Sequence, residues 1–75
     1  MKELALFVVK RLVDKPEAVA VTESRDGEDL VLKLNVDEAD KGKVIGKQGK
    51  VIKAVRAVVG AAAQKAGLRV VVEID

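Results

Sequence analysis

The sequence predicts an α+β fold with a three-stranded mixed sheet and three helices packed on one face of it. Apolar residues recur at helical spacing in segments 3–13 and 50–66, and at alternate positions in two segments that an Asp-Gly pair joins. About thirty residues separate the second strand from the last, enough for a crossover that makes these two strands parallel. The 75 residues form a single domain, 1–75, in the order helix, strand, strand, helix, helix, strand.

The first predicted helix covers Glu3 to Val13. The main apolar stripe of this helix, which we expect to face the sheet, comprises Leu4, Phe7, Val8 and Leu12. Pro16 follows shortly and stops the helix, because proline cannot donate the next backbone hydrogen bond.

Two strands follow and form a hairpin. Ala18 to Ser24 has β-branched residues at alternate places, which is typical of a strand. The second strand has Leu30, Leu32, Leu34 and Val36 on one face. Between the strands, Asp26-Gly27 is a strong hairpin signal, since tight hairpin turns need the positive φ that glycine adopts readily.

A short helix comes next. Asp37 stands at an N-cap position and Asp40 lies three residues later, close to the pattern of a capping box. We expect this helix to end near Ile45, where a loop with two glycines begins.

A long helix from Lys50 to Ala66 and a final strand from Leu68 to Ile74 complete the fold. Gly67 between them is a natural C′ residue. The face of the long helix that we expect to be buried comprises Val51, Ile52, Val55, Val58, Val59, Ala62 and Ala66.

Positive charge gathers around the glycine loop. From Met1 to Ala39 the chain has six Lys or Arg against nine Asp or Glu, whereas segment 40–72 has eight Lys or Arg against Asp40 alone. A lysine-rich segment is often only a solvated helix surface. Here it lies beside two glycines, each of which costs roughly 1 kcal/mol in a helix interior, and this combination indicates polyanion binding.

The loop and its flanks read Val44-Ile45-Gly46-Lys47-Gln48-Gly49-Lys50-Val51-Ile52. This segment is similar to the KH-domain signature V-I-G-x-x-G-x-x-I, and the order of elements resembles the type II, prokaryotic KH arrangement. Segment 40–50 in particular resembles the small bacterial KhpA-like family. The resemblance covers essentially the whole chain. It implies RNA binding as a homodimer or with a larger KhpB/Jag-type KH partner, in the role of an RNA chaperone or post-transcriptional regulator.

The residue types of the loop suit a clamp on single-stranded RNA. Gly46 and Gly49 have no Cβ, so we expect a sugar-phosphate backbone to approach the main chain closely. Gly49 opens the long helix, whose unpaired N–H groups and positive dipole end favour phosphate. The RNA-binding set that we predict comprises Ile45, Gly46, Lys47, Gln48, Gly49, Lys50, Lys43, Lys53 and Arg56.

The sequence leaves two roles open for some residues near the loop. Val44 and Ile52 either support the RNA-binding groove or belong to the core, and the core is favoured for Ile52. Arg56 either contacts phosphate or stays in solvent. Because Phe7 is the only aromatic residue, bases cannot stack on rings. Any base selectivity must therefore come from hydrogen bonds to base edges and from groove shape.

The composition argues against an enzyme. The chain has no cysteine and no histidine, which removes thiolate and imidazole chemistry and the usual metal ligands. A nucleotide-binding P-loop needs G-x-x-x-x-G-K-[S/T], but Gly46 and Gly49 are too close together and Val51 stands where the hydroxyl is needed. Thr22 and Ser24 belong to no catalytic constellation. We expect no cofactor, no metal and no small-molecule substrate.

The N-terminal apolar run does not resemble a targeting segment. It is short, Lys10 and Arg11 interrupt it, and it has neither a basic leader nor a small-residue cleavage site. We expect a cytoplasmic protein with no membrane contact.

Protein interaction is a second candidate function, from a different class. The first helix has further apolar residues off its main stripe, and the long helix has small residues outside its buried face. The dimer-interface candidates are Ala54, Ala57, Gly60, Ala61, Leu6 and Val9. The alternative is that the sheet covers both apolar faces, and the sequence leaves open which helix would make the contact. In this second interpretation nucleic-acid binding, including single-stranded DNA, is weak or secondary.

Overall fold

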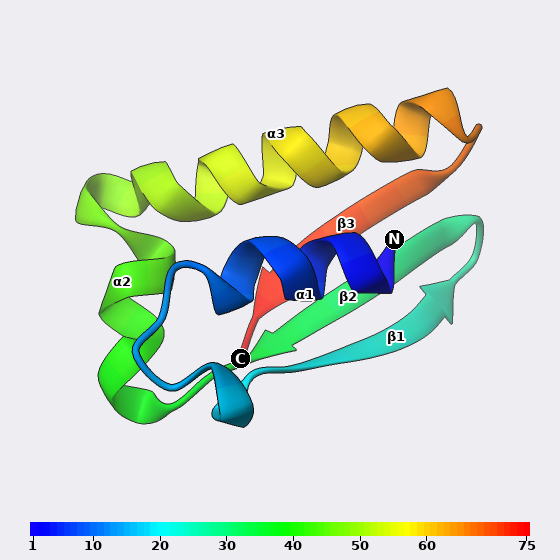
Figure 1. The fold of residues 1–75 in the computed structure, drawn as a ribbon. Coiled ribbons are helices and arrows are strands. Elements are labelled where there is room, and N and C mark those ends of the chain that lie inside the picture. Colours follow the sequence, from blue (N-terminus) through cyan, green and yellow to red (C-terminus); the bar gives the residue numbers. More distant parts are fainter.

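The computed structural model describes residues 1–75, and its helices and strands follow the predicted order (Figure 1). They are α1 (Lys2–Lys10), β1 (Ala20–Asp26), β2 (Asp29–Asn35), α2 (Lys41–Ile45), α3 (Lys50–Lys65) and β3 (Arg69–Ile74). Short 3-10 turns add Pro16–Ala18, Glu38–Asp40 and Lys47–Gly49. The α+β class and the helix and strand order of a type II KH fold are confirmed.

The sheet is mixed, with strand order β1-β2-β3. β1 and β2 pair antiparallel, and β2 and β3 pair parallel with Leu32 opposite Val72. The crossover between β2 and β3 contains α2 and α3, as expected for a parallel connection. β3 is therefore an edge strand, with one side of its backbone unpaired by the sheet.

The hairpin that Asp26-Gly27 signals is confirmed. Asp26 still pairs with Asp29, so the loop between the two strands consists of Gly27 and Glu28. Gly27 has φ +64°, and glycine in the first loop position is one of the two common solutions for a two-residue hairpin.

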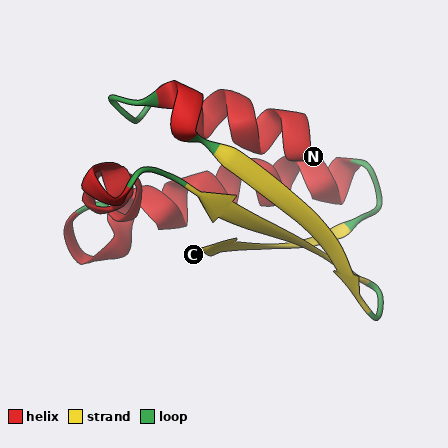
Figure 2. Ribbon diagram, turned by 90° about the horizontal axis from the view of Figure 1, so that it is seen from below, coloured by secondary structure: helices red, strands yellow, loops and turns green.

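The helices lie on one face of the sheet and enclose the core with it (Figure 2). Alternation along β2 directs its leucines to this face. The largest fully buried apolar side chains are Leu32, Leu34, Val9, Val44 and Val59. The other face of the sheet is open and carries charged pairs such as Arg69 with Asp29, whose Nε and Oδ1 atoms lie 3.2 Å apart.

α1 buries a different face from the predicted stripe. Ala5 and Val9, one turn apart, are buried, whereas the Phe7 and Leu12 side chains are 57% and 37% exposed. The other two residues of the predicted stripe are only half-buried. A small residue at position 5 lets the helix lie close to the sheet, which turns the larger apolar side chains outward. The exposed Phe7 ring is covered by the Arg11 guanidinium, 4.3 Å from the ring centroid.

α3 also buries a narrower stripe than predicted. Ile52, Val55, Val59 and Ala63 are buried, while Val58 is 49% exposed. The predicted position Ala66 is exposed as well. The stripe is narrow because only one side of α3 faces the sheet, and the side toward α1 is left partly open.

β1 begins two residues later than predicted because Pro16 starts a 3-10 turn. The Ala18 N–H donates to Lys15 O at 3.0 Å, and the Val19 N–H donates to Pro16 O at 3.1 Å. The fixed φ of proline suits the first position of such a turn. α1 is shorter than predicted and ends at Lys10.

The C-terminal end of α3 confirms Gly67 as the C′ residue. Gly67 has φ +73°, and its N–H donates to Gln64 O at 3.1 Å. The Leu68 N–H donates to Ala63 O at 2.8 Å, which completes a Schellman motif.

The expected capping box is wrong. The Asp37 Oδ1 accepts the Ala39 N–H at 2.9 Å, but Asp40 turns inward and is only 2% exposed. The two Asp40 carboxylate oxygens accept the backbone N–H groups of Asp14 at 3.2 Å and Lys15 at 3.0 Å. This buried carboxylate therefore ties the loop after α1 to the start of α2.

We predict that Asp40→Ala lowers the free energy of unfolding by about 2–4 kcal/mol, because it leaves two amide donors without their charged acceptor. Urea unfolding followed by circular dichroism measures the change. Glu38→Ala is the matched control, since its exposed pair with Lys41 contributes at most about 1 kcal/mol. Equal stability of the two variants would contradict the assigned role of Asp40.

Candidate nucleic-acid interface

The loop between α2 and α3 changes the chain direction over residues 46–49, at the end of the molecule away from the β-hairpin turn (Figure 1). α2 ends with the Gly46 N–H donating to Gly42 O at 2.8 Å. Gly46 then takes φ +75° and ψ 173°, a combination essentially restricted to glycine. Gln48 and Gly49 are left-handed, with φ +57° and +75°.

The two glycines are required for different reasons. A Cβ on Gly46 would lie 2.3 Å from Val51 Cγ2 and 2.8 Å from Val51 N. A Cβ on Gly49 would meet only Ile52 Cγ2, at 3.9 Å. Thus Val51 fills the space that a side chain at Gly46 would take, and the close approach of RNA to this glycine stays a prediction. Gly49 is needed for its positive φ rather than for space.

Three lysines around the loop carry unpaired charge. Lys47, Lys50 and Lys53 are exposed, and none of them lies within ion-pair distance of a carboxylate. α3 begins directly after Gly49 with no side-chain cap and no acidic residue in its first turn. The positive end of the helix dipole and the lysine side chains therefore act in the same place. The exposed Gln48 adds a neutral hydrogen-bonding group.

Lys43, also predicted to bind RNA, is already paired. Its Nζ donates to Asp14 Oδ2 on the loop after α1. This hydrogen bond, helped by the charges of Asp14 and Asp40, raises the pKa of Lys43 above the ordinary 10.5. A raised pKa means that the pair is fully charged at neutral pH and is lost only as pH rises through that higher pKa. Lys43 thus contributes less free charge to the site than the other lysines.

The apolar residues flanking the loop divide between surface and core. Val44 is fully buried and Ile52 is 6% exposed, so both belong to the core. Ile45 is 38% exposed beside the loop. Of these residues, only Ile45 offers apolar surface to a ligand.

The Arg56 side chain is bound to β3 rather than idle in solvent. Its Nε donates to Val72 O on β3, at 3.0 Å. Together with residues 70–73 it lines a hollow of about 270 Å³ along the edge strand. Neither this bond nor the hollow could be predicted, because residues 56 and 72 meet only after the crossover has formed.

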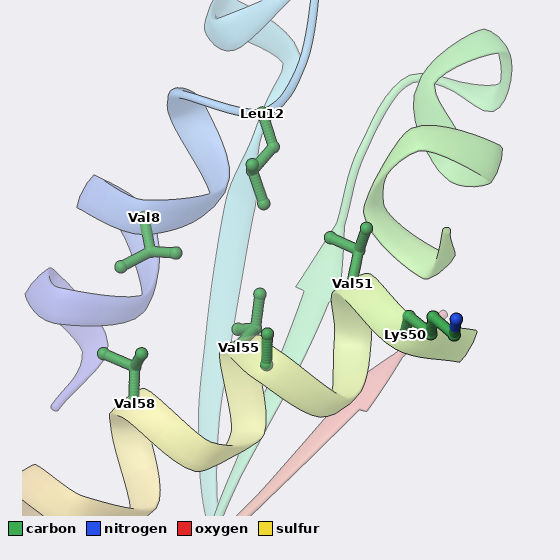
Figure 3. Close-up of a pocket in the computed structure, with 7 residues that line it drawn as sticks. Val8, Leu12, Lys50, Val51, Val55 and Val58 are labelled. Atoms are coloured by element: carbon green, nitrogen blue, oxygen red, sulfur yellow. The ribbon is translucent and has the colours of Figure 1, made fainter. Parts of the chain in front are cut away.

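A second hollow, of about 350 Å³, lies between α1 and α3 (Figure 3). We call it the α1–α3 groove; its lining residues are Val8, Leu12, Lys50, Val51, Ala54, Val55 and Val58. Figure 3 shows the side chains of Val8 and Val58 pointing into the space between the two helices. The partial exposure of Leu12 and Val58 reflects this open space.

The predicted dimer-interface residues are not gathered in one place. Val9 is fully buried in the core and is unavailable, and Leu6 is half-buried. Ala54 lines the α1–α3 groove. The other three candidates, Ala57, Gly60 and Ala61, lie on α3 outside the residues that line the groove, and Gly60 is half-buried. The larger groove residues could not be recognised from the sequence, because their helical spacing is the same as that of a buried face.

No three histidine, cysteine or acidic side chains lie close enough together to hold a metal ion. Asp37 and Asp40 bind backbone amides instead. None of the helices has both the length and the apolar character needed to cross a membrane.

Comparison with known proteins agrees with the fold and the loop. The protein-family model described as KhpA/KhpB, KH domain, matches residues 2–74 of this chain. RNA-binding protein KhpA of Clostridium perfringens is 55% identical over 74 residues, which cover 99% of both chains. KhpA of Aquifex aeolicus is 43% identical over 74 residues, covering 99% of this chain and 94% of that one. These relatives are named as RNA-binding proteins, and the family is not one of enzymes.

Among solved structures, Aquifex aeolicus Era contains a similar fold. It superimposes with a TM-score of 0.61 at 23% identity, over 97% of this chain and 28% of that chain. This likeness supports the fold alone.

We predict that Gly46→Ala destabilises the protein more than Gly49→Ala does. Gly49→Ala should cost about 1–2 kcal/mol, the strain of a left-handed residue. Gly46→Ala adds overpacking against Val51, typically about 1–3 kcal/mol, to a similar backbone strain. Urea unfolding of both variants checks the order. A Gly46→Ala variant as stable as Gly49→Ala would show that the contact with Val51 relaxes freely.

Proposed function

We propose that this chain, which belongs to the KhpA/KhpB family of KH domains, binds single-stranded RNA through the loop from Gly46 to Gly49. Its relatives in Clostridium perfringens and Aquifex aeolicus match this chain over nearly their whole length, and they are named as RNA-binding proteins. RNA is therefore the polyanion that the family membership favours.

The observation that carries the proposal is the meeting of an uncapped helix start with unpaired lysines. Lys47, Lys50 and Lys53 lie at the first turn of α3, which no side chain caps. The Gly49 and Lys50 N–H groups already donate to the backbone oxygens of Gly46 and Lys47, so a phosphate placed there would be held mainly by the combined field of the helix dipole and the cations. No carboxylate in the first turn opposes it.

The rest of the clamp follows from the elements beside the loop. Ile45 offers an exposed apolar surface next to the phosphate site. From there a single strand of RNA can run along α3 to β3, the edge strand of the sheet, where one side of the backbone is not paired with another strand. The KH resemblance implies about four nucleotides held in this way, with the bases turned toward the protein.

The α1–α3 groove favours pairing with a second KH domain, either another copy or a KhpB-type partner. Its lining is apolar except for Lys50, which it shares with the proposed phosphate site. Two weak clamps joined in this way would gain avidity on RNA that reaches both. A function purely in protein interaction would use the same groove but would not need the lysines of the loop.

We predict that Lys47→Asp/Gln48→Asp lowers the affinity for single-stranded RNA about tenfold or more, because it places negative charge beside the phosphates. Fluorescence anisotropy with a labelled pool of short RNAs measures the affinity. For the unchanged protein, neutralising three or four phosphates gives a slope of log affinity against log salt of roughly −2 to −3.

The matched control is Gln64→Asp/Lys65→Asp, which makes the same charge change on exposed residues at the far end of α3. It should bind RNA nearly as well as the unchanged protein. Circular dichroism confirms that both variants are folded. Equal loss in both variants would mean that only net charge matters, and no loss in either would remove the loop from the site.

We predict that Val58→Glu shifts the protein toward the monomer, because a carboxylate in the apolar groove would be buried unpaired on association. Sedimentation velocity across a concentration series measures the shift. Val71→Glu is the control, since Val71 is similarly exposed, at 42%, but lies on the sheet. A Val58→Glu variant that associates as before would place the contact elsewhere.

A further inference from the structure

We infer that Arg56 is a base-selecting residue, which favours guanine or cytosine over adenine at the edge of β3. This inference rests on the proposed RNA clamp and extends it from the phosphate backbone to the bases. It assigns to Arg56 a contact different from the phosphate contact that its charge alone would suggest.

The Arg56 side chain is fixed in place by the strand. Its Nε donates to Val72 O at 3.0 Å, across the space between α3 and β3. A guanidinium has five N–H groups, so four remain after this bond. No carboxylate lies within ion-pair distance of Arg56. The remaining donors are thus held at the strand edge without a charged partner.

The surroundings of Arg56 suit a base better than a phosphate. The hollow that it lines has a volume of about 270 Å³, slightly below the roughly 300–1,000 Å³ typical of drug-sized ligand sites. Val70, Val71 and Val72 make most of the remaining lining apolar, with Val71 42% exposed and Val72 buried beneath the surface. Glu73 lines the same hollow, and its carboxylate would repel a phosphate.

The edge strand completes the polar part of the site. In an extended strand the N–H and C=O of one residue point to the same side. Because Val72 O faces Arg56 at the open edge, the Val72 N–H faces that edge too. A base in the hollow would therefore meet a strand amide and an arginine, both of which are donors.

An arrangement of donors selects bases that present neighbouring acceptors. Guanine offers O6 and N7, the pair to which arginine binds bidentately. Cytosine offers N3 and O2 when its Watson–Crick edge is unpaired, as in a single strand. Adenine places its N6 amino donor beside N1 on one edge and beside N7 on the other, so a guanidinium that binds either edge bidentately meets a donor.

The test uses short uridine-rich RNAs that differ only in one central base. The unchanged protein should bind the RNA with central guanine or cytosine about tenfold more tightly than the RNA with central adenine. Arg56→Gln should reduce this ratio to near one. Lys65→Gln, which removes the same charge from the exposed end of α3, should leave the ratio unchanged.

A second measurement needs no variant. Replacing the central guanine by 7-deazaguanine removes the N7 acceptor and should abolish the guanine advantage for the unchanged protein. This result would hold even if Arg56→Gln failed to fold.

The outcomes separate this inference from the proposed function. If the unchanged protein binds no RNA, the proposed clamp itself is wrong. If it binds all the RNAs equally, the clamp stands and the base selection by Arg56 is overturned. A uniform loss for every RNA with Arg56→Gln would make Arg56 a phosphate contact and would likewise overturn it.

Discussion

The contact between Gly46 and Val51 is the constraint on which the rest of the interface depends. No side chain fits between them, since an added Cβ would lie 2.3 Å from Val51 Cγ2. The chain can therefore leave α2 and enter α3 within one tight turn, and the start of α3 is left without a cap.

Two further interactions hold this turn against the body of the protein. The buried Asp40 carboxylate binds the Asp14 and Lys15 amides, which joins the loop after α1 to the base of α2. On the other side, Arg56 bonds Val72 O and fixes α3 over the edge strand. The helices on either side of the loop are thus held to the loop after α1 and to β3, although the lysines of the loop itself are exposed. Such rigidity lowers the entropy lost when a flexible strand of RNA binds.

Features that depend on local pattern could be predicted from the sequence. The alternating leucines of β2, the glycine at the end of α3 and the loop signature each follow from neighbouring residues. The buried face of α1 could not be predicted, because Ala5 with Val9 fits the helical period as well as the larger residues do. Which set faces inward depends on how closely α1 approaches the sheet. The roles of Asp40 and Arg56 likewise depend on residues 14–15 and 72, which sequence alone does not place beside them.

The most direct measurement is a titration of the isotope-labelled protein with a short single-stranded RNA, followed by proton–nitrogen correlation spectra. The account predicts the largest shifts for the amides of residues 47–53 and for Val72 at the edge of β3, with Val8, Leu12 and Val58 of the α1–α3 groove little affected. Shifts concentrated instead in α1, or on the open face of the sheet around Val31 and Lys33, would contradict it.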